Sequence, residues 1–269
     1  MGRTARPVKA AREEVEEDRR FVTALARGLD VLRCFGPGEQ WLGNQEIARR
    51  TGLPKPTVSR ITFTLTSLGY LDHSPEREMY AVGLPAIGLG FRVLSHFDIG
   101  RVARPFMQAL ADEVRGAVSL GVRHGDEVVY VAHCRSAAPL TLGLDVGARL
   151  PMAQSAMGRA VLFCLEEQAR EQILRCVQQS SAPAAWNGLR AALAEAAADF
   201  AVRGFVATAP GAEIGVAAVP LPIGDGREPL GLNCGGPAGA FPQEKLLNEV
   251  GPRLVRAAAA IGAALRSEN

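Results

Sequence analysis

The sequence lacks the features of a disulfide-bonded, zinc-binding or membrane-spanning protein. Its five cysteines are odd in number and form no Cys-x-x-Cys pair, so they predict reduced, buried thiols in a cytoplasmic protein. No apolar run is long enough to cross a bilayer, and the charged residues 1–20 contain no apolar signal core. The net charge is only +2, so composition alone does not indicate a nucleic-acid partner.

Catalytic signatures are lacking as well. The sequence contains no His-Glu-x-x-His, Gly-x-Ser-x-Gly or phosphate-binding glycine-lysine motif. His133 and Cys134 are adjacent, and neighbours on a strand point to opposite faces, so they cannot form a nucleophile–base pair. The four histidines stand apart in the chain, without the spacing of metal ligands. We therefore predict no catalytic residue, no metal site and no cofactor.

The most informative segment that is present, residues 44–70, has the pattern of a helix, a turn and a second helix. Gly52 stands where a helix can end in a left-handed conformation. Pro54 and Pro56 prevent continuation of that helix and suit the first turn of the next one. This order predicts a helix-turn-helix whose second helix lies in the major groove of double-stranded DNA.

The second helix of this motif divides into an apolar and a polar face at the spacing of an α-helix. The apolar stripe expected to pack on the core consists of Val58, Ile61, Leu65 and Leu68. Ser59, Arg60 and Phe63 project from the other side. Arg60 can bond guanine or a phosphate, and Ser59 a base edge or a phosphate. Phe63 suits either a thymine methyl group or a dimer contact.

Further DNA contacts are expected at the helix starts and in a hairpin. Asn44 can cap the first helix, and Lys55 and Thr57 are predicted phosphate anchors because free N–H groups of a first turn favour anions. Residues 69–82 predict a two-stranded wing with Arg77 at its tip, near a phosphate or the minor groove. The predicted DNA-binding residues are therefore Asn44, Lys55, Thr57, Ser59, Arg60, Phe63 and Arg77.

Two more helices are predicted beside the motif. Residues 21–35 form a helix whose expected core residues are Val22, Leu25, Leu29, Leu32 and Phe35. Residues 84–97 carry more apolar surface than one face can hide, so this connector is predicted to pack against a second copy of itself. A homodimer would present two recognition helices to a pseudo-palindromic operator.

From residue 99 the pattern changes to strands joined by tight turns, with helices at the start, middle and end. The predicted strands are 117–123, 127–133, 140–144, 205–208, 215–223 and 229–233, and the predicted helices are 102–114, 155–165, 189–202 and 243–266. This pattern indicates an α+β domain on one mainly antiparallel sheet. Residues 145–158 read as a loop running into a helix, whose free N–H groups attract a carboxylate.

With its parts in this order, the chain resembles the IclR-type transcriptional regulators. The resemblance rests on ALARGLDVLRCF, IARRTGLPKPTVSRITFTL and DVGARLPMAQSAMGRA, and it extends from about residue 21 to the C-terminus. It implies an α+β protein with an N-terminal winged helix-turn-helix, a helical connector and a C-terminal GAF-like α/β effector-binding domain. It also implies homodimers, often paired into tetramers, and small organic acids as effectors.

The chain departs from the family pattern at several positions. Thr62 stands where the family usually has Leu, and the polar residues of the effector region differ, so no named ligand carries over. Along residues 145–158 the predicted effector-binding residues are Leu150, Met152, Gln154, Ser155, Ala156 and Met157. The resemblance places the opposing wall at Thr208, Ala218, Asn233 and Gly235.

The predicted organisation has four segments. They are a flexible arm (1–20), a winged helix-turn-helix DNA-binding domain (21–83), a connector helix (84–98) and an effector-binding domain (99–269). The predicted function is transcriptional regulation in which a small organic acid changes connector packing and so operator affinity. The alternatives are a winged-helix protein–protein interaction module and a small-molecule enzyme. No membrane partner is predicted.

Overall fold

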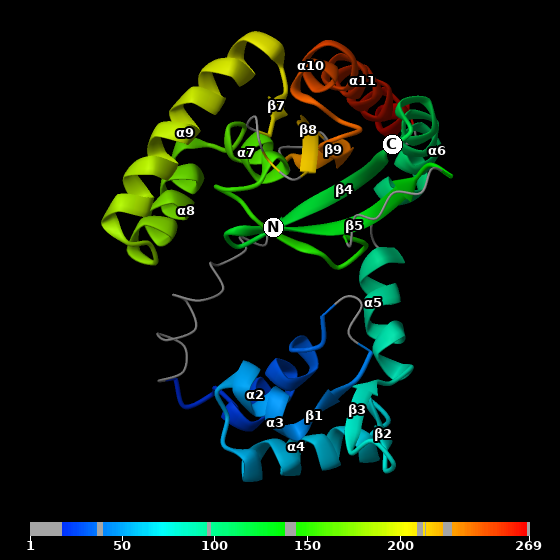
Figure 1. Cartoon of the computed structure of the whole chain (residues 1–269), viewed down its shortest axis with the longest axis vertical. Helices are drawn as coiled ribbons and strands as arrows, with labels where there is room; N and C mark the ends of the chain where they lie inside the picture. The colour runs from blue at the N-terminus through cyan, green and yellow to red at the C-terminus, as the bar shows by residue number, and fades with distance from the viewer. Residues whose placement is uncertain are drawn as a thin grey trace. The chain divides into compact units, whose positions relative to one another are not determined.

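The protein is described from a computed structural model, which divides the chain into two compact units between residues 97 and 98 (Figure 1). The structure describes residues 18–36, 40–95, 98–137, 144–208, 212, 214–222 and 228–267, with only the backbone for 91–95 and 98. In this part of the chain, no helix combines the length and the apolar character needed to cross a membrane.

The N-terminal unit is a winged helix-turn-helix, as predicted. Its elements in chain order are α2 (Thr23–Arg33), β1 (Leu42–Gly43), α3 (Asn44–Thr51), α4 (Lys55–Ser67), β2 (Leu71–Ser74), β3 (Met79–Val82) and α5 (Pro85–Ser95). The three strands form one antiparallel sheet in the order β1-β3-β2. The two-residue strand β1 was not predicted, because its sequence is too short to show an alternating pattern.

The core of this unit is small, and the prediction for its first helix was partly wrong. The buried core residues are Val31, Leu42, Ile47, Val58 and Leu71. Leu32 and Phe35 pack against this core, as expected. Val22, Leu25 and Leu29 do not, because α2 turns the side that carries Val31 inward and leaves these three residues 61%, 63% and 43% exposed.

The second unit is built on one six-stranded sheet in the order β6-β5-β4-β9-β8-β7, in which every neighbouring pair is antiparallel. Its strands are β4 (Ala117–His124), β5 (Glu127–Arg135), β6 (Arg149–Pro151), β7 (Val206–Ala207), β8 (Ile214–Leu221) and β9 (Leu230–Pro237). Its helices are α6 (Asp98–Val114), α7 (Ala156–Leu162), α8 (Glu167–Gln179), α9 (Pro183–Arg203), α10 (Gln243–Lys245), a π-helical turn (Leu246–Val250) and α11 (Gly251–Ser267).

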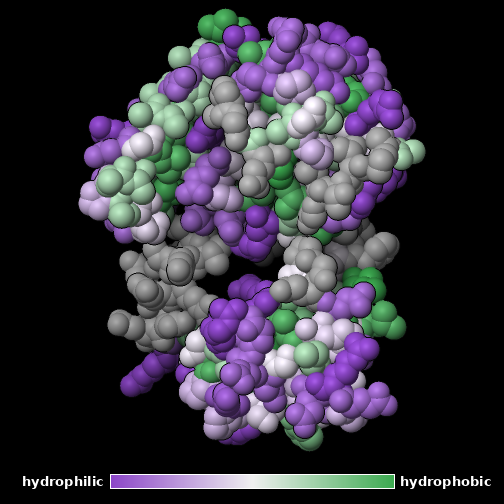
Figure 2. Space-filling model, viewed as in Figure 1, coloured by the Kyte–Doolittle hydropathy of each residue, from purple (hydrophilic) through white to green (hydrophobic). Residues whose placement is uncertain are grey.

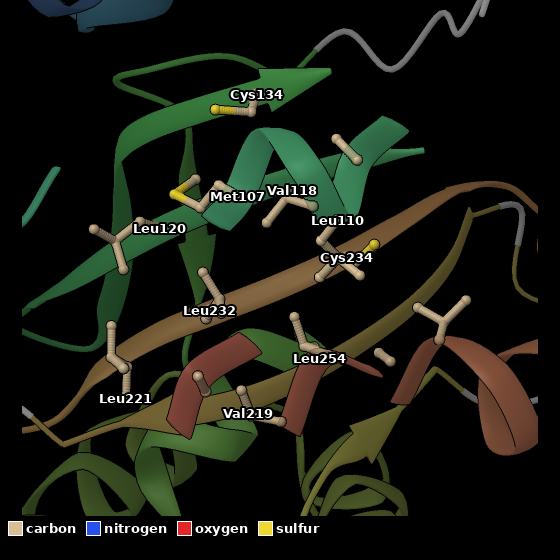
Figure 3. Close-up of a cluster of buried hydrophobic side chains, with 14 of the residues drawn as sticks. Met107, Leu110, Val118, Leu120, Cys134, Val219, Leu221, Leu232, Cys234 and Leu254 are labelled. Atoms are coloured by element: carbon tan, nitrogen blue, oxygen red, sulfur yellow. The ribbon is translucent and has the colours of Figure 1, made fainter. Parts of the chain in front are cut away.

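Helices cover both faces of this sheet (Figure 1). On one face, Met107 of α6 and Leu254 of α11 pack against strand residues such as Leu120 and Leu232 (Figure 3). On the other face, α7, α8 and α9 pack over a second core. The alternation along β5 places Cys134 in the first core, whereas His133 lines a cavity on the second side. The predicted antiparallel α+β domain is therefore confirmed.

Several elements of this unit differ from the prediction. The segment predicted as a loop before α7 contains β6, in which Leu150 pairs with Val128 of β5. Helix α8 was missed because it is mostly polar and has Ile173 as its buried residue. The single helix predicted over 243–266 is divided by the π-helical turn, and Pro252 is the second residue of α11. Residues 140–143 and 224–227, predicted as strand and turn, lie outside the described residues.

Candidate functional sites

The turn between α3 and α4 has the geometry that its sequence indicates. Gly52 ends α3 with φ of +69°, the left-handed conformation that favours glycine. Pro54 precedes the first residue of α4, and Pro56 lies in its first turn, where a missing N–H costs no helical hydrogen bond. This turn positions α4 as the second helix of the motif.

The inward face of α4 is centred on Val58 and Thr62, which are both fully buried. Ile61 and Leu65 pack against the same core, as predicted. Leu68 was wrongly assigned to this stripe. It follows the last residue of α4 and is 63% exposed, because the helical rotation turns this position away from the side that carries Val58 and Thr62.

Asn44 has a different role from the predicted cap. It is the first residue of α3, and Gly43 holds the capping position without a side-chain hydrogen bond. The side chain of Asn44 instead faces α4, where its Oδ1 lies 3.3 Å from the hydroxyl of Thr62. That hydroxyl also lies 3.2 Å from the carbonyl oxygen of Ser59. The pair connects the two helices of the motif.

The outward face of α4 carries the residues expected to contact DNA. Lys55, Ser59 and Arg60 are exposed, Thr57 is half-buried, and Phe63 is 73% exposed. Exposing this much of a phenyl ring to water is unfavourable, and a partner that covers the ring would remove that cost. This face therefore offers two cations, hydroxyl donors and an apolar ring.

The wing brings two further predicted residues together. Arg77 lies in the turn between β2 and β3, with its guanidinium carbon 5.8 Å from the ring centre of Trp41. A hollow of about 570 Å³ between the wing and the start of α3 is lined by both Asn44 and Arg77. His73 and Tyr80 stack in its wall, with ring centres 4.7 Å apart.

An apolar groove of about 710 Å³ runs between α2 and α4. Thr57 and Arg60 line its α4 side, and Leu25 and Leu29 line its α2 side. Leu89 of α5 also contributes. Figure 2 shows hydrophobic residues at the start of α5, where Leu84, just before the helix, and Ile87 are exposed.

In the second unit, the start of α7 is already capped by its own chain. Ser155 accepts a hydrogen bond from the N–H of Gly158 at 3.0 Å and donates to the carbonyl of Pro151 at 2.8 Å. Gln154 beside it is exposed, and Leu150 is half-buried on β6. The predicted attraction of a carboxylate to this helix start is weakened, because Ser155 satisfies one of the free N–H groups.

The predicted apolar wall of the effector site belongs to the packed core. Met152, Ala156 and Met157 are all buried in the core on the α7 side. Met157 lies over Gly121 of β4 and Gly231 of β9, where any Cβ would come within 2.5 Å of its side chain. These two glycines pair across the strands, so together they leave the space that the Met157 side chain occupies.

The opposing wall is divided between core and cavity. Ala218 is buried in the same core, and Thr208 bonds to Val216, accepting from its N–H at 3.1 Å. Asn233 and Gly235 line a cavity of about 20 Å³. The other lining residues, which were not predicted, are Ala117, Ser119, Tyr130, His133, Leu144, Ile214 and Val216.

The polar residues of this cavity form two hydrogen-bonded pairs. Ser119 Oγ lies 2.9 Å from His133 Nδ1, and Asn233 Nδ2 donates to the Tyr130 hydroxyl at 2.6 Å. Burial raises the pKa of Tyr130 and lowers the pKa of His133, so both are neutral near pH 7. Ser119 pairs in register with His133 on one side and Asn233 on the other. The sequence signal that could have indicated this cavity was a polar residue within an otherwise apolar stretch of each of the three strands.

Charged groups at this site are few. Arg135, two residues beyond His133 on β5, is paired with Asp145 at 2.9 Å. No group of three or more His, Cys, Asp or Glu residues that could hold a metal ion occurs within the described ranges. The site offers hydrogen-bonding groups in an apolar setting, which suits binding of a small molecule.

The fold and these sites define a DNA-binding protein that joins a winged helix-turn-helix to a separate domain with a small polar cavity. Residues 24–75 match the IclR helix-turn-helix domain, and residues 91–263 match the C-terminal domain of the bacterial transcriptional regulator IclR. The chain belongs to the IclR family of transcriptional regulators, as its resemblance implied.

Individual relatives agree with this assignment. The chain is 33% identical to the HTH-type transcriptional regulator TsaQ1/TsaQ2 of Comamonas testosteroni, covering 97% of this chain and 94% of that protein. An IclR family transcriptional regulator from Brucella abortus has 42% identity and a TM-score of 0.75, covering 93% of this chain and 95% of that one. An IclR homolog from Microbacterium hydrocarbonoxydans was solved in complex with 4-hydroxybenzoate. It has 25% identity and a TM-score of 0.70, covering 91% of this chain and 99% of that one.

Proposed function

We propose that this regulator binds its operator through α4 and the wing, and that a small organic acid bound in the second unit changes operator affinity. The observation that carries the proposal is the division of α4 into a buried face, Val58 and Thr62, and an exposed face with Ser59, Arg60 and Phe63. Arginine and hydroxyl side chains on such a helix suit base edges and phosphates. Asn44, Lys55, Thr57 and Arg77 are proposed to hold the flanking backbone.

The operator complex is proposed to contain a homodimer. Leu25 of α2, Leu84 just before α5 and Ile87 of α5 are more than half exposed, which is costly on a monomer. Covering them with a second copy would also place two recognition helices on one duplex. A symmetric operator with half-sites about one helical turn apart is then expected.

The effector is proposed to act by binding one arrangement of the dimer more tightly than another. Support comes from the polar cavity and from the Microbacterium relative, which was solved with 4-hydroxybenzoate. A ligand in contact with the sheet would shift how α5 and α6 are held in the dimer. A ligand with equal affinity for both arrangements would have no effect on operator binding.

The proposal is tested by selecting duplexes from a random library with the full chain and measuring binding by fluorescence anisotropy. We expect a preferred sequence whose affinity falls steeply with salt. Arg60→Ala should weaken binding by about 1–3 kcal/mol if it bonds guanine. Arg175→Ala is the matched control, because Arg175 is an exposed arginine on α8 of the other unit.

The same experiment separates the alternatives. If the wild-type protein prefers one duplex and Arg60→Ala binds that duplex no better than random competitor, α4 is confirmed as the recognition helix. If no duplex is preferred over random DNA, the winged unit is better explained as a protein-binding module. Turnover of an organic acid by the purified protein would instead indicate an enzyme.

A further inference from the structure

The cavity in the second unit is lined by polar atoms from three neighbouring strands. Ser119 of β4 stands in register between His133 of β5 and Asn233 of β9, and Tyr130 bonds to Asn233 from the same side. Ser119, Tyr130 and Asn233 are at most 6% exposed. The four side chains form two hydrogen-bonded pairs, and the hydroxyls of Ser119 and Tyr130 each keep hydrogen-bonding capacity beyond those bonds.

The size of this cavity limits which ligand group can reach its floor, formed by the polar side chains of Ser119, Tyr130, His133 and Asn233. Its volume is about 20 Å³. A site of that volume accommodates roughly one water-sized group. One oxygen atom of a ligand therefore fits between the polar side chains, whereas both oxygens of a carboxylate do not.

The charges around the cavity also disfavour a carboxylate on its floor. None of the described lining residues is Lys or Arg. Segments 138–143 and 209–213, which adjoin Leu144 and Ile214 in the chain, contain no basic residue in the sequence. Arg135 lies on the His133 side of β5 but is already paired with Asp145. A carboxylate on this floor would be desolvated without a counter-charge, which is strongly unfavourable.

A hydroxyl group matches the same floor well. It both donates and accepts, as do the Ser119 hydroxyl, the Tyr130 hydroxyl and the Asn233 amide. We propose that Ser119, Tyr130, His133 and Asn233 recognise a hydroxyl group of the effector, and that the effector is a hydroxy acid whose carboxylate lies away from this floor. This assignment rests on the proposed control of the regulator by a small molecule.

The test uses the full chain and two matched pairs of probes, 4-hydroxybenzoate with benzoate and 3-hydroxybutyrate with butyrate. Binding is measured by isothermal calorimetry and by the shift in melting temperature. In at least one pair, the hydroxylated acid should bind about tenfold more tightly or better than its partner, since a buried hydrogen bond contributes roughly that much.

Three variants locate the preference. Ser119→Ala and Tyr130→Phe should each reduce it to about threefold or less, a partial loss of one buried hydrogen bond. Ser136→Ala is the control, because it removes a buried hydroxyl that does not line the cavity. It should leave the preference unchanged. Circular dichroism verifies that each variant is folded. If Tyr130→Phe does not fold, Ser119→Ala still tests the proposal.

The outcomes are distinguishable. The inference is overturned if the deoxygenated acid binds as tightly as the hydroxylated one, or if the two cavity variants keep the wild-type preference. If operator binding is intact but no probe binds or changes it, control by organic acids of these classes fails, and the inference fails with it. Loss of operator binding itself is scored separately with the selected duplex.

Discussion

The hydroxyl of Thr62 lies 3.3 Å from Oδ1 of Asn44, joining the middle of α4 to the first residue of α3. Thr62 is fully buried, so its hydroxyl depends on these protein partners. The resemblance to the family leads one to expect Leu at this position. In this chain, a polar contact therefore contributes to the angle between the two helices of the motif.

Replacing Thr62 with Val should destabilise the winged unit by about 1 kcal/mol, because the amide of Asn44 loses its buried partner while the shape is kept. Denaturant unfolding of the full chain measures the change. Thr64→Val is the control, since Thr64 is exposed on the same helix and bonds to the carbonyl of Arg60. Equal effects of the two substitutions would remove the interhelix contact as the cause.

Phe63→Ala should leave the free energy of unfolding within about 0.5 kcal/mol of wild type, because the ring is 73% exposed. Operator affinity should fall, since the ring is proposed to contact the duplex. Anisotropy titrations with the selected operator measure this loss. Val202→Ala, which alters an exposed residue of α9, should change neither quantity. Wild-type operator affinity in Phe63→Ala would reassign the ring to another contact.

Gly231→Ala should destabilise the second unit by about 1–3 kcal/mol through overpacking. The new methyl group would come within 2.3 Å of Met157 Cγ. Gly239→Ala, at a position with open space, is the control. Adding Met157→Ala to Gly231→Ala should give a double mutant less destabilised than the sum of the two single changes. Strict additivity would show that the methionine is not the obstacle.

Cys234 should resist alkylation in the folded protein. Burial raises the pKa of its thiol to about 12, so little reactive thiolate forms near pH 8. Mass spectrometry after brief treatment with iodoacetamide should find Cys234 unmodified, and unfolding in denaturant should expose it. Because the unfolded thiol deprotonates at lower pH than the folded one, this group also makes stability decline above about pH 8.5. Rapid modification of Cys234 under native conditions would contradict its burial.

The helix-turn-helix was predicted well from the sequence, because Gly52, Pro54 and Pro56 fix the backbone conformation at and next to their own positions. The antiparallel sheet of the second unit and its hairpins were predicted because turns and alternating patterns are also local signals. Of the cavity, Asn233 and Gly235 were predicted from the family resemblance. Ser119 and His133 were not, since they meet Asn233 only once the register of three strands is set. Exposure of Leu25 and burial of Thr62 likewise depend on which way a helix turns toward its core.

The six-stranded sheet ends in two very short outer strands, three residues in β6 and two in β7. A long bare edge strand invites another chain to add a strand through backbone hydrogen bonds. Strands as short as β6 and β7 offer few such groups of their own, so we expect both to be poor templates for an added strand. If a second copy of this unit pairs through helix side chains instead, single surface substitutions should change the specificity of that pairing.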